Sequence, residues 1–214
     1  SIEDLLESSD QFIIKQKKEW LEILSGFESK NNYQIYNAQK DHLGYISEKG
    51  SGIWQAIKRV FLRSHRPFEI HISNLEGVEL LNVHRSFFWF FSDLFVEFNG
   101  KKYGSIHRRF SILFKTYSIL DPHGVEIYKV KSPIWRLWKF PIINIMGNEV
   151  GVITKKWQGV LKEVFTDADA FFIDLKAKEL TTEQKILLFV SGISIDFDYF
   201  EQNQGTSSIL EFLD

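Results

Sequence analysis

The chain has 214 residues, of which 44% are hydrophobic and 15% aromatic, and its formal net charge at pH 7 is -2. This length can bury one large core, so we expect a single domain over residues 1–214, with peripheral tails at 1–9 and 202–214. A charge near zero argues against a specific nucleic-acid binder, and the absence of cysteine excludes disulfides, thiol catalysis, cysteine zinc sites and palmitoylation. No signal peptide is recognisable, so we expect a cytoplasmic protein.

Along the chain, short apolar or aromatic runs alternate with turns that contain Gly, Asn or Asp. Residues 12–14 are typical of a strand, and residues 19–24 of a short helix that ends at Gly26. The strongest hairpin signal is the dipeptide Asn99-Gly100. Five strand pairs are expected, namely 33–36 with 43–46, 68–72 with 78–83, 94–98 with 103–106, 117–120 with 125–130, and 140–145 with 150–153. A further pair joins 160–165 to 171–175, which brings the total to about a dozen strands.

A helix is expected to begin near Thr182, because Thr181 and Gln184 have the spacing of a capping box. The residues after this start are apolar on every side of the helix, so the helix must be enclosed by protein or lipid. The buried positions we expect include Ile186, Leu187, Phe189, Val190 and Ile193.

Enclosure by protein is favoured over lipid. The uncharged run from Ile186 to Ile195 is shorter than the roughly 20 residues that span a bilayer, and Asp196 and Asp198 interrupt it. Gly192 would cost about 1 kcal/mol relative to Ala unless a wall packs closely against its backbone. Residues 193–199 also alternate between apolar and polar, which is equally typical of a strand.

About a dozen strands either close on themselves or form a sandwich, and an all-apolar helix that needs enclosure favours closure. We therefore predict a mainly β fold, a closed barrel around a central hydrophobic C-terminal helix. No part of the length requires a second domain.

Several segments resemble the phospholipid scramblase family. They are residues 10–14, 22–28, 31–35, Arg66-Pro67-Phe68, Trp157-Gln158-Gly159, 163–169 and Ile195-Asp196-Phe197. The resemblance covers nearly all of the chain, and Phe-Thr-Asp-Ala-Asp at 165–169 is a specific element of it. It implies the tubby-like fold, a twelve-stranded barrel threaded by a hydrophobic C-terminal helix. It also implies action at the cytosolic face of membranes, typically linked to calcium.

Five consecutive aromatic residues form the first candidate for membrane contact. They are Phe87, Phe88, Trp89, Phe90 and Phe91. Five rings in a row cannot all point to one side of a strand, and exposed rings settle at the headgroup level of a bilayer. In the resembling family the matching region is usually a palmitoylated cysteine cluster, which aromatic insertion would replace here. A wide core strand with a bulge is an equally good interpretation.

Clustered cations form a candidate site for anionic lipids. They are Lys58, Arg59, Arg63, Arg66, Arg108 and Arg109. Each cation near an anionic leaflet contributes about 1 kcal/mol, so these residues would hold the chain to phosphatidylserine or phosphoinositide surfaces. The alternative is a solvated loop or strand edge that carries protective charge. A third cluster, residues 135–139, has the sequence Trp-Arg-Leu-Trp-Lys, typical of either an interfacial segment or a core-lining strand.

Calcium is the one cofactor the resemblance implies, through a loop that starts at Asp167. Asp167 and Asp169 match the first ligand positions of an EF-hand loop, but Phe171, Phe172 and Lys178 occupy the later ones. The match is therefore poor, and calcium is weakly supported.

The sequence contains no serine elbow and no phosphate-binding loop, and its six histidines have no spacing that demands chemistry. It therefore gives no evidence for covalent catalysis. Lipid scrambling is the most that we expect. Two functions remain: a peripheral, scramblase-like protein that binds anionic phospholipids at the cytosolic face and moves lipids between leaflets, or a soluble tubby-like module that binds phosphoinositides or protein partners without scrambling. No helix long enough to span about 30 Å of hydrocarbon is predicted, so lipid binding has more support than lipid transport.

Overall fold

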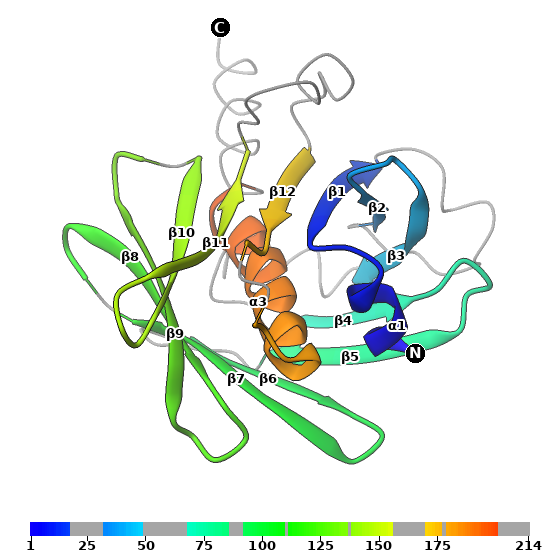
Figure 1. Ribbon diagram of the computed structural model, residues 1–214, viewed down its shortest axis with the longest axis horizontal. Helices are drawn as coiled ribbons and strands as arrows, with labels where there is room; N and C mark the ends of the chain where they lie inside the picture. The colour runs from blue at the N-terminus through cyan, green and yellow to red at the C-terminus, as the bar shows by residue number, and fades with distance from the viewer. Residues whose placement is uncertain are drawn as a thin grey trace, which may run out of the picture.

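The computed structural model describes residues 1–17, 32–48, 68–85, 92–109, 111–136, 138–155, 170–176 and 179–200. In these ranges twelve antiparallel strands form one closed barrel, in which consecutive strands are neighbours and β12 pairs with β1 (Figure 1). The predicted closed twelve-stranded barrel is confirmed. The strands are β1 (Gln11–Lys17), β2 (Asn32–Asn37), β3 (His42–Glu48), β4 (Phe68–Ser73), β5 (Glu79–Arg85), β6 (Ser92–Phe98), β7 (Lys101–Arg109), β8 (Phe114–Leu120), β9 (Glu126–Pro133), β10 (Lys139–Asn144), β11 (Glu149–Thr154) and β12 (Ala170–Asp174).

The five strand pairs expected from sequence are all confirmed as hairpins, from β2–β3 to β10–β11. The turn between β6 and β7 has positive φ at both Asn99 (50°) and Gly100 (78°), as a tight hairpin requires. Alternation along β6 places Leu94 and Val96 in the core and leaves Phe95 45% exposed on the outer wall. The expected helix at 19–24 and strand at 160–165 lie outside the described residues. The expected pairing of 171–175 with 160–165 is wrong, because β12 pairs with β1 on one edge and with β11 on the other.

The barrel surrounds helix α3 (Thr182–Ile195), which begins with the predicted capping box between Thr181 and Gln184. Phe12 of β1 meets Phe189 edge-on at 5.2 Å between ring centroids. On the opposite side of the barrel, Gly104 of β7 leaves room for Leu187. Strands therefore contact α3 from both sides, and its predicted apolar residues are buried, at no more than 1% exposure. They are Ile186, Leu187, Phe189, Val190 and Ile193.

Gly192 lies where the wall packs closely against α3. A Cβ atom built on Gly192 would lie 2.5 Å from Cδ1 of Ile173 in β12, closer than carbon atoms tolerate. The close packing that the sequence required to offset this glycine is therefore present.

The expectation of a peripheral tail at residues 1–9 is wrong. Residues Ile2–Glu7 form helix α1, with a capping box at Ser1 and Asp4, and α1 packs against α3 at one end of the barrel. One face of this short helix is buried, and it carries Ile2, Leu5 and Leu6. Such a short helix shows too few apolar positions for its periodicity to be recognised. The other expected tail, residues 202–214, lies outside the described residues.

The strand interpretation of residues 193–199 is also wrong. α3 continues without a break into a π-helical turn, η3 (Asp196–Phe200). The alternation in the sequence instead reflects two aspartates, Asp196 and Asp198, that turn toward polar partners on the barrel wall.

Candidate functional site

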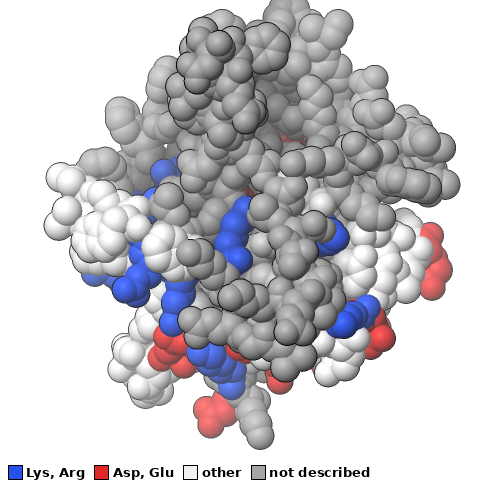
Figure 2. Space-filling view, turned by 90° about the horizontal axis from the view of Figure 1, so that it is seen from above, with Lys and Arg blue, Asp and Glu red and all other residues white. Residues whose placement is uncertain are grey.

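The two ends of the barrel differ in what closes them. At the end we call proximal, α1 and the first turn of α3 lie beside the hairpin turns. At the distal end, β7 and β9 finish, β8 and β10 begin, and α3 runs out into η3. Seen from the distal end, Figure 2 shows Lys and Arg across the described part of the face, with Asp and Glu mainly toward its margin.

Asp198 is the centre of a buried charged layer at the distal end. Its carboxylate accepts a hydrogen bond from Arg85 Nη1 at 2.7 Å and another from the Tyr117 hydroxyl at 2.7 Å. The side chains of Arg85 and Asp198 are 1% and 0% exposed. A buried carboxylate without such partners would be strongly destabilising. The Arg85 and Tyr117 side chains of the barrel wall therefore stabilise the charge of Asp198 at this buried position.

Asp196, two residues earlier, has a second set of partners. It accepts a hydrogen bond from the Tyr33 hydroxyl at 2.9 Å, and Lys155 Nζ lies 3.8 Å from its other oxygen. The two aspartates that argue against a membrane span thus attach the end of α3 to β2, β5, β8 and the residue after β11.

Further cations surround the same layer. Arg108 Nη1 lies 3.9 Å from Asp198 Oδ2, and its side chain is 27% exposed. The pKa of Lys115 falls from 10.5 to about 8, chiefly because burial removes water from the ammonium group and also because Arg108 repels it, although Asp198 opposes the shift. The depressed pKa therefore reflects mainly the loss of water around the Lys115 ammonium group, and the nearby Arg108 adds to it.

The structure separates the predicted pair Arg108 and Arg109. Successive residues of β7 point to opposite faces, so Arg108 turns toward Asp198 in the interior and Arg109 is exposed on the outer wall. The remaining predicted lipid-binding cations, Lys58, Arg59, Arg63 and Arg66, lie outside the described residues, as do the aromatic residues Phe87, Phe88, Trp89, Phe90 and Phe91.

Apolar side chains are exposed beside this charged mouth, and we call them the tryptophan edge. Its members are Ile112 (76%), Leu113 (56%), Ile134 (42%), Trp135 (65%) and Trp138 (42%). The backbone joins the two contributing turns, because Ile134 N–H donates to the Leu113 carbonyl at 3.1 Å. Both tryptophans are exposed, so the core-lining interpretation of residues 135–139 is wrong for them.

The tryptophan edge extends what the sequence indicated. Trp135 and Trp138 are recognisable in the sequence as members of an aromatic and basic cluster, but Ile112 and Leu113 are not. The signal that could have identified Ile112 and Leu113 is that they follow shortly after Arg108 and Arg109. Exposed Arg136 and Lys139 lie among these residues. Rings and cations therefore occur together at the distal end.

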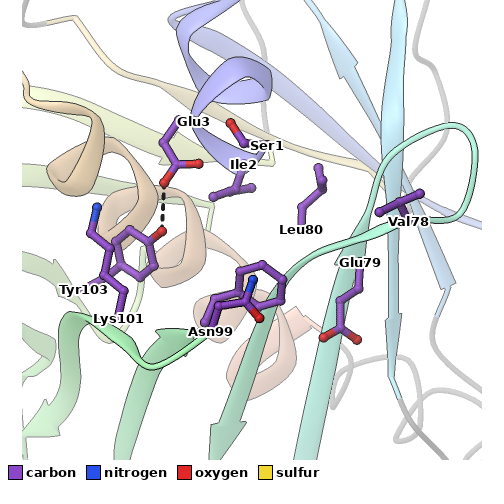
Figure 3. A pocket seen from close by; sticks show the side chains of 10 residues that line it. Ser1, Ile2, Glu3, Val78, Glu79, Leu80, Asn99, Lys101 and Tyr103 are labelled. Atoms are coloured by element: carbon purple, nitrogen blue, oxygen red, sulfur yellow. Dashed lines mark hydrogen bonds between the residues drawn. The ribbon is translucent and has the colours of Figure 1, made fainter.

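The proximal end contains a pocket of about 390 Å³ between α1 and the β4–β5 and β6–β7 turns (Figure 3). In it the Tyr103 hydroxyl donates a 2.8 Å hydrogen bond to Glu3. Burial, together with this bond to a carboxylate, raises the pKa of Tyr103 to about 12. The bond connects α1 to β7, which assigns it a structural role in holding α1 over the barrel.

Comparison with known proteins decides the family. Residues 1–202 match the sequence model of a family described as Scramblase. The chain belongs to the scramblase family. The resemblance noted in the sequence is thereby confirmed over most of the chain.

Among relatives, a phospholipid scramblase family protein of Schizosaccharomyces pombe is 25% identical over 92% of this chain and 61% of its own length. The protein named altered inheritance rate of mitochondria protein 25, from Saccharomyces cerevisiae, is 24% identical over 94% of this chain and 73% of its own length. Human phospholipid scramblase 1 is 24% identical over 92% of this chain and 65% of its own length. The scramblase-family chain thus spans 61% of the fission-yeast relative and 65% of the human one.

In the described part of this scramblase-family chain, no helix is both long and apolar enough to cross a membrane. The described residues also include no group of three or more His, Asp or Glu side chains placed to hold a metal ion. Asp167 and Asp169, the calcium ligands implied by resemblance, lie outside the described residues. Calcium therefore remains an expectation.

Proposed function

We propose that this scramblase-family chain binds anionic phospholipid membranes peripherally, at the cytosolic face, through its distal end. The observation that carries the proposal is the tryptophan edge, five exposed apolar residues next to exposed cations on one end of the barrel. Tryptophan rings settle at the membrane interface, and isoleucine and leucine side chains beside them enter the acyl boundary.

Charge supports the same orientation. Arg136 and Lys139 are exposed among the apolar residues, and Arg109 is exposed at the end of β7. Each of these cations contributes about 1 kcal/mol near an anionic leaflet, and the contribution decreases as salt is added. A membrane without net charge would be bound only through the exposed apolar side chains.

The strand connections favour the same end. Arg85 and Ser92, the described residues on either side of the predicted aromatic contact Phe87 to Phe91, are at the distal ends of β5 and β6. Glu48 and Phe68, on either side of the predicted basic segment, are at the matching ends of β3 and β4. Both predicted contact segments are thus connected to the end that carries the tryptophan edge.

A second candidate is binding without lipid transport, as in a tubby-like regulatory module that recognises phosphoinositides or a protein partner. The filled interior favours it, because among the described residues α3 occupies the inside of the barrel with buried apolar side chains, which gives a polar headgroup no favourable surroundings there. Membrane binding is shared by both candidates, and leaflet exchange separates them.

Sedimentation with vesicles tests binding. We expect the native chain to sediment with vesicles of phosphatidylserine and phosphatidylcholine, but not with phosphatidylcholine alone at moderate salt. Trp135→Ser/Trp138→Ser should weaken binding about tenfold or more. Ile145→Ser/Met146→Ser is the matched control, since these two residues are 80% and 77% exposed in the β10–β11 turn at the proximal end. Equal binding by both double variants would refute the proposed orientation.

Single charge reversals test the electrostatic part. Lys139→Glu at the distal end should weaken binding to anionic vesicles roughly fivefold or more, whereas Lys40→Glu in the β2–β3 turn at the proximal end should have little effect. A leaflet-exchange assay with fluorescent lipid then compares protein-containing and protein-free vesicles. Acceleration would establish scrambling, and its absence alongside intact binding would establish the second candidate.

A further inference from the structure

Three polar side chains on the outer wall of the barrel form a connected chain of hydrogen bonds. Asp93 in β6 and His107 in β7 are directly paired, and Asp93 Oδ1 lies 2.5 Å from His107 Nδ1. The other ring nitrogen, Nε2, lies 2.8 Å from Ser105 Oγ, two residues earlier on the same face of β7.

The chemistry of the donors assigns the protons. An ionised carboxylate only accepts hydrogen bonds, so Nδ1 of His107 carries the proton that it donates to Asp93. In the neutral imidazole Nε2 is then an acceptor, and Ser105 donates its hydroxyl proton to it. This is the arrangement in which a histidine, oriented by a carboxylate, acts as general base toward a serine.

A pocket of about 540 Å³ opens beside these residues. Ser105 and His107 line it, together with the apolar side chains of Phe95, Leu120 and Pro122. Lys102 and His123, from β7 and the β8–β9 turn, are exposed and line the same pocket. Glu97 and Asp121 also line it. The pocket therefore combines a candidate nucleophile, its base, an apolar surface, hydrogen-bond donors and two carboxylates.

The strand geometry at this position is also unusual. The pairing of β6 with β7 shifts register between Val96 and Glu97, and Gly104, directly before Ser105, has φ of 144°. A Cβ atom at Gly104 would lie 2.2 Å from the Leu120 carbonyl oxygen, so only glycine fits. Bulges of this kind re-aim neighbouring side chains and are frequent beside active sites.

We propose that Ser105 is a nucleophile that hydrolyses a short-chain carboxylic ester, with His107 as general base and Asp93 as its positioning residue. Ser105 Oγ forms a bond to the carbonyl carbon while its proton moves to His107 Nε2. Collapse of the tetrahedral intermediate breaks the bond to the alcohol oxygen, which leaves with the proton from His107. His107 Nε2 then takes a proton from water as the water oxygen bonds to the acyl carbon. Collapse of this second intermediate breaks the bond from the acyl carbon to Ser105 Oγ, which takes the proton back from His107 as the acid leaves.

A fluorophosphonate probe, which phosphonylates only activated serines, tests the nucleophile. We expect mass spectrometry to find the label on Ser105, and Ser105→Ala to abolish both labelling and hydrolysis of p-nitrophenyl butyrate. His107→Asn should reduce the labelling rate about 100-fold or more, the range of general base catalysis. Ser118→Ala is the matched control, since Ser118 is paired with His107 on β8 but its hydroxyl bonds Glu126 instead. Absent labelling at Ser105, or labelling unaffected by His107→Asn, would overturn the proposal.

A cysteine variant keeps the test independent of esterase turnover. The native chain has no cysteine, so Ser105→Cys introduces a single thiol. If His107 acts as base, iodoacetamide should alkylate this thiol at least tenfold faster than in Ser105→Cys/His107→Asn. Equal rates in the two variants would assign the hydrogen-bonded chain a purely structural role.

The role of Asp93 has its own readout. In the native protein the His107 Nδ1 proton, bonded to a carboxylate, should give a strongly downfield proton NMR signal. Asp93→Asn should remove this signal and slow labelling of Ser105 by a similar factor to His107→Asn, with the melting temperature little changed. Retention of both signal and labelling would show that Asp93 does not position the imidazole.

Discussion

The Tyr117 hydroxyl donates a 2.7 Å hydrogen bond to the Asp198 carboxylate, across 81 positions in the sequence. Both residues are buried, each at 1% exposure. The bond fastens the π-helical end of α3 to β8, and with it the charged mouth of the barrel.

Removing that hydroxyl should destabilise the fold measurably. Tyr117→Phe should lower the free energy of unfolding by about 1.5–3 kcal/mol, the range for a hydrogen bond to a charged group. Tyr128→Phe is the control, because Tyr128 is also buried in the barrel but has no side-chain hydrogen bond among the described residues. Urea unfolding monitored by circular dichroism gives both values. A similar loss in the two variants would contradict a specific role for the bond.

Removing the Arg85 side chain should lower the free energy of unfolding more than removing the Tyr117 hydroxyl. Arg85→Met leaves the Asp198 charge without its closest cation in a buried site, which costs about 3–5 kcal/mol in comparable cases. Arg85→Met/Asp198→Leu removes both charges and should recover much of the loss. If the double variant were no more stable than the single one, the cost would lie in packing and not in the unpaired charge.

Gly192 provides a test of enclosure. Gly192→Ala would ordinarily stabilise a helix by about 1 kcal/mol, yet here the new methyl group meets Ile173, and we expect a net loss of about 1–3 kcal/mol. Gly192→Ala/Ile173→Val removes the Cδ1 atom in conflict and should restore part of the stability. Thermal unfolding of the three variants measures this, and a more stable Gly192→Ala would show that the barrel does not press on α3.

Lys115 should make stability depend on pH. Its pKa is about 8 in the folded chain and returns to 10.5 on unfolding, so between these pH values the unfolded chain binds more protons at this site. The free energy of unfolding therefore gains a contribution that rises with pH across this window, and protonated Lys115 destabilises the fold below it. Lys115→Met should be more stable than the native chain near pH 7, by an amount that shrinks toward pH 10. A pH-independent difference would contradict the lowered pKa.

Calcium dependence can be separated from membrane binding. The proposed contacts at the distal end are rings and cations, none of which is a calcium ligand, so we expect sedimentation with anionic vesicles to persist in EGTA. Asp167→Ala/Asp169→Ala should leave binding in EGTA unchanged. Binding that requires calcium and is lost in this double variant would establish the calcium site that the family resemblance implies.

Local signals account for the parts of the fold that the sequence predicted. Asn99-Gly100 specifies its own turn, and Thr181 with Gln184 specifies the start of α3, because the atoms involved are within four residues of one another. The length and uniform apolarity of the helix then required a wall, and a dozen strands supplied it. α1 escaped prediction because a six-residue helix has too few positions to establish a period.

The candidate sites depended on contacts between distant residues. Asp198 meets Arg85 from 113 positions away, and Asp93 meets His107 only because the register of β6 against β7 places them opposite one another. Sequence alone was enough for a closed barrel, its enclosed helix and its family resemblance, since periodicity and turn chemistry are local properties. Three-dimensional packing was needed to show that Arg108 faces inward, that Trp135 and Trp138 are exposed, and that a serine, a histidine and an aspartate meet, because strand pairing and burial set which side chains share a surface.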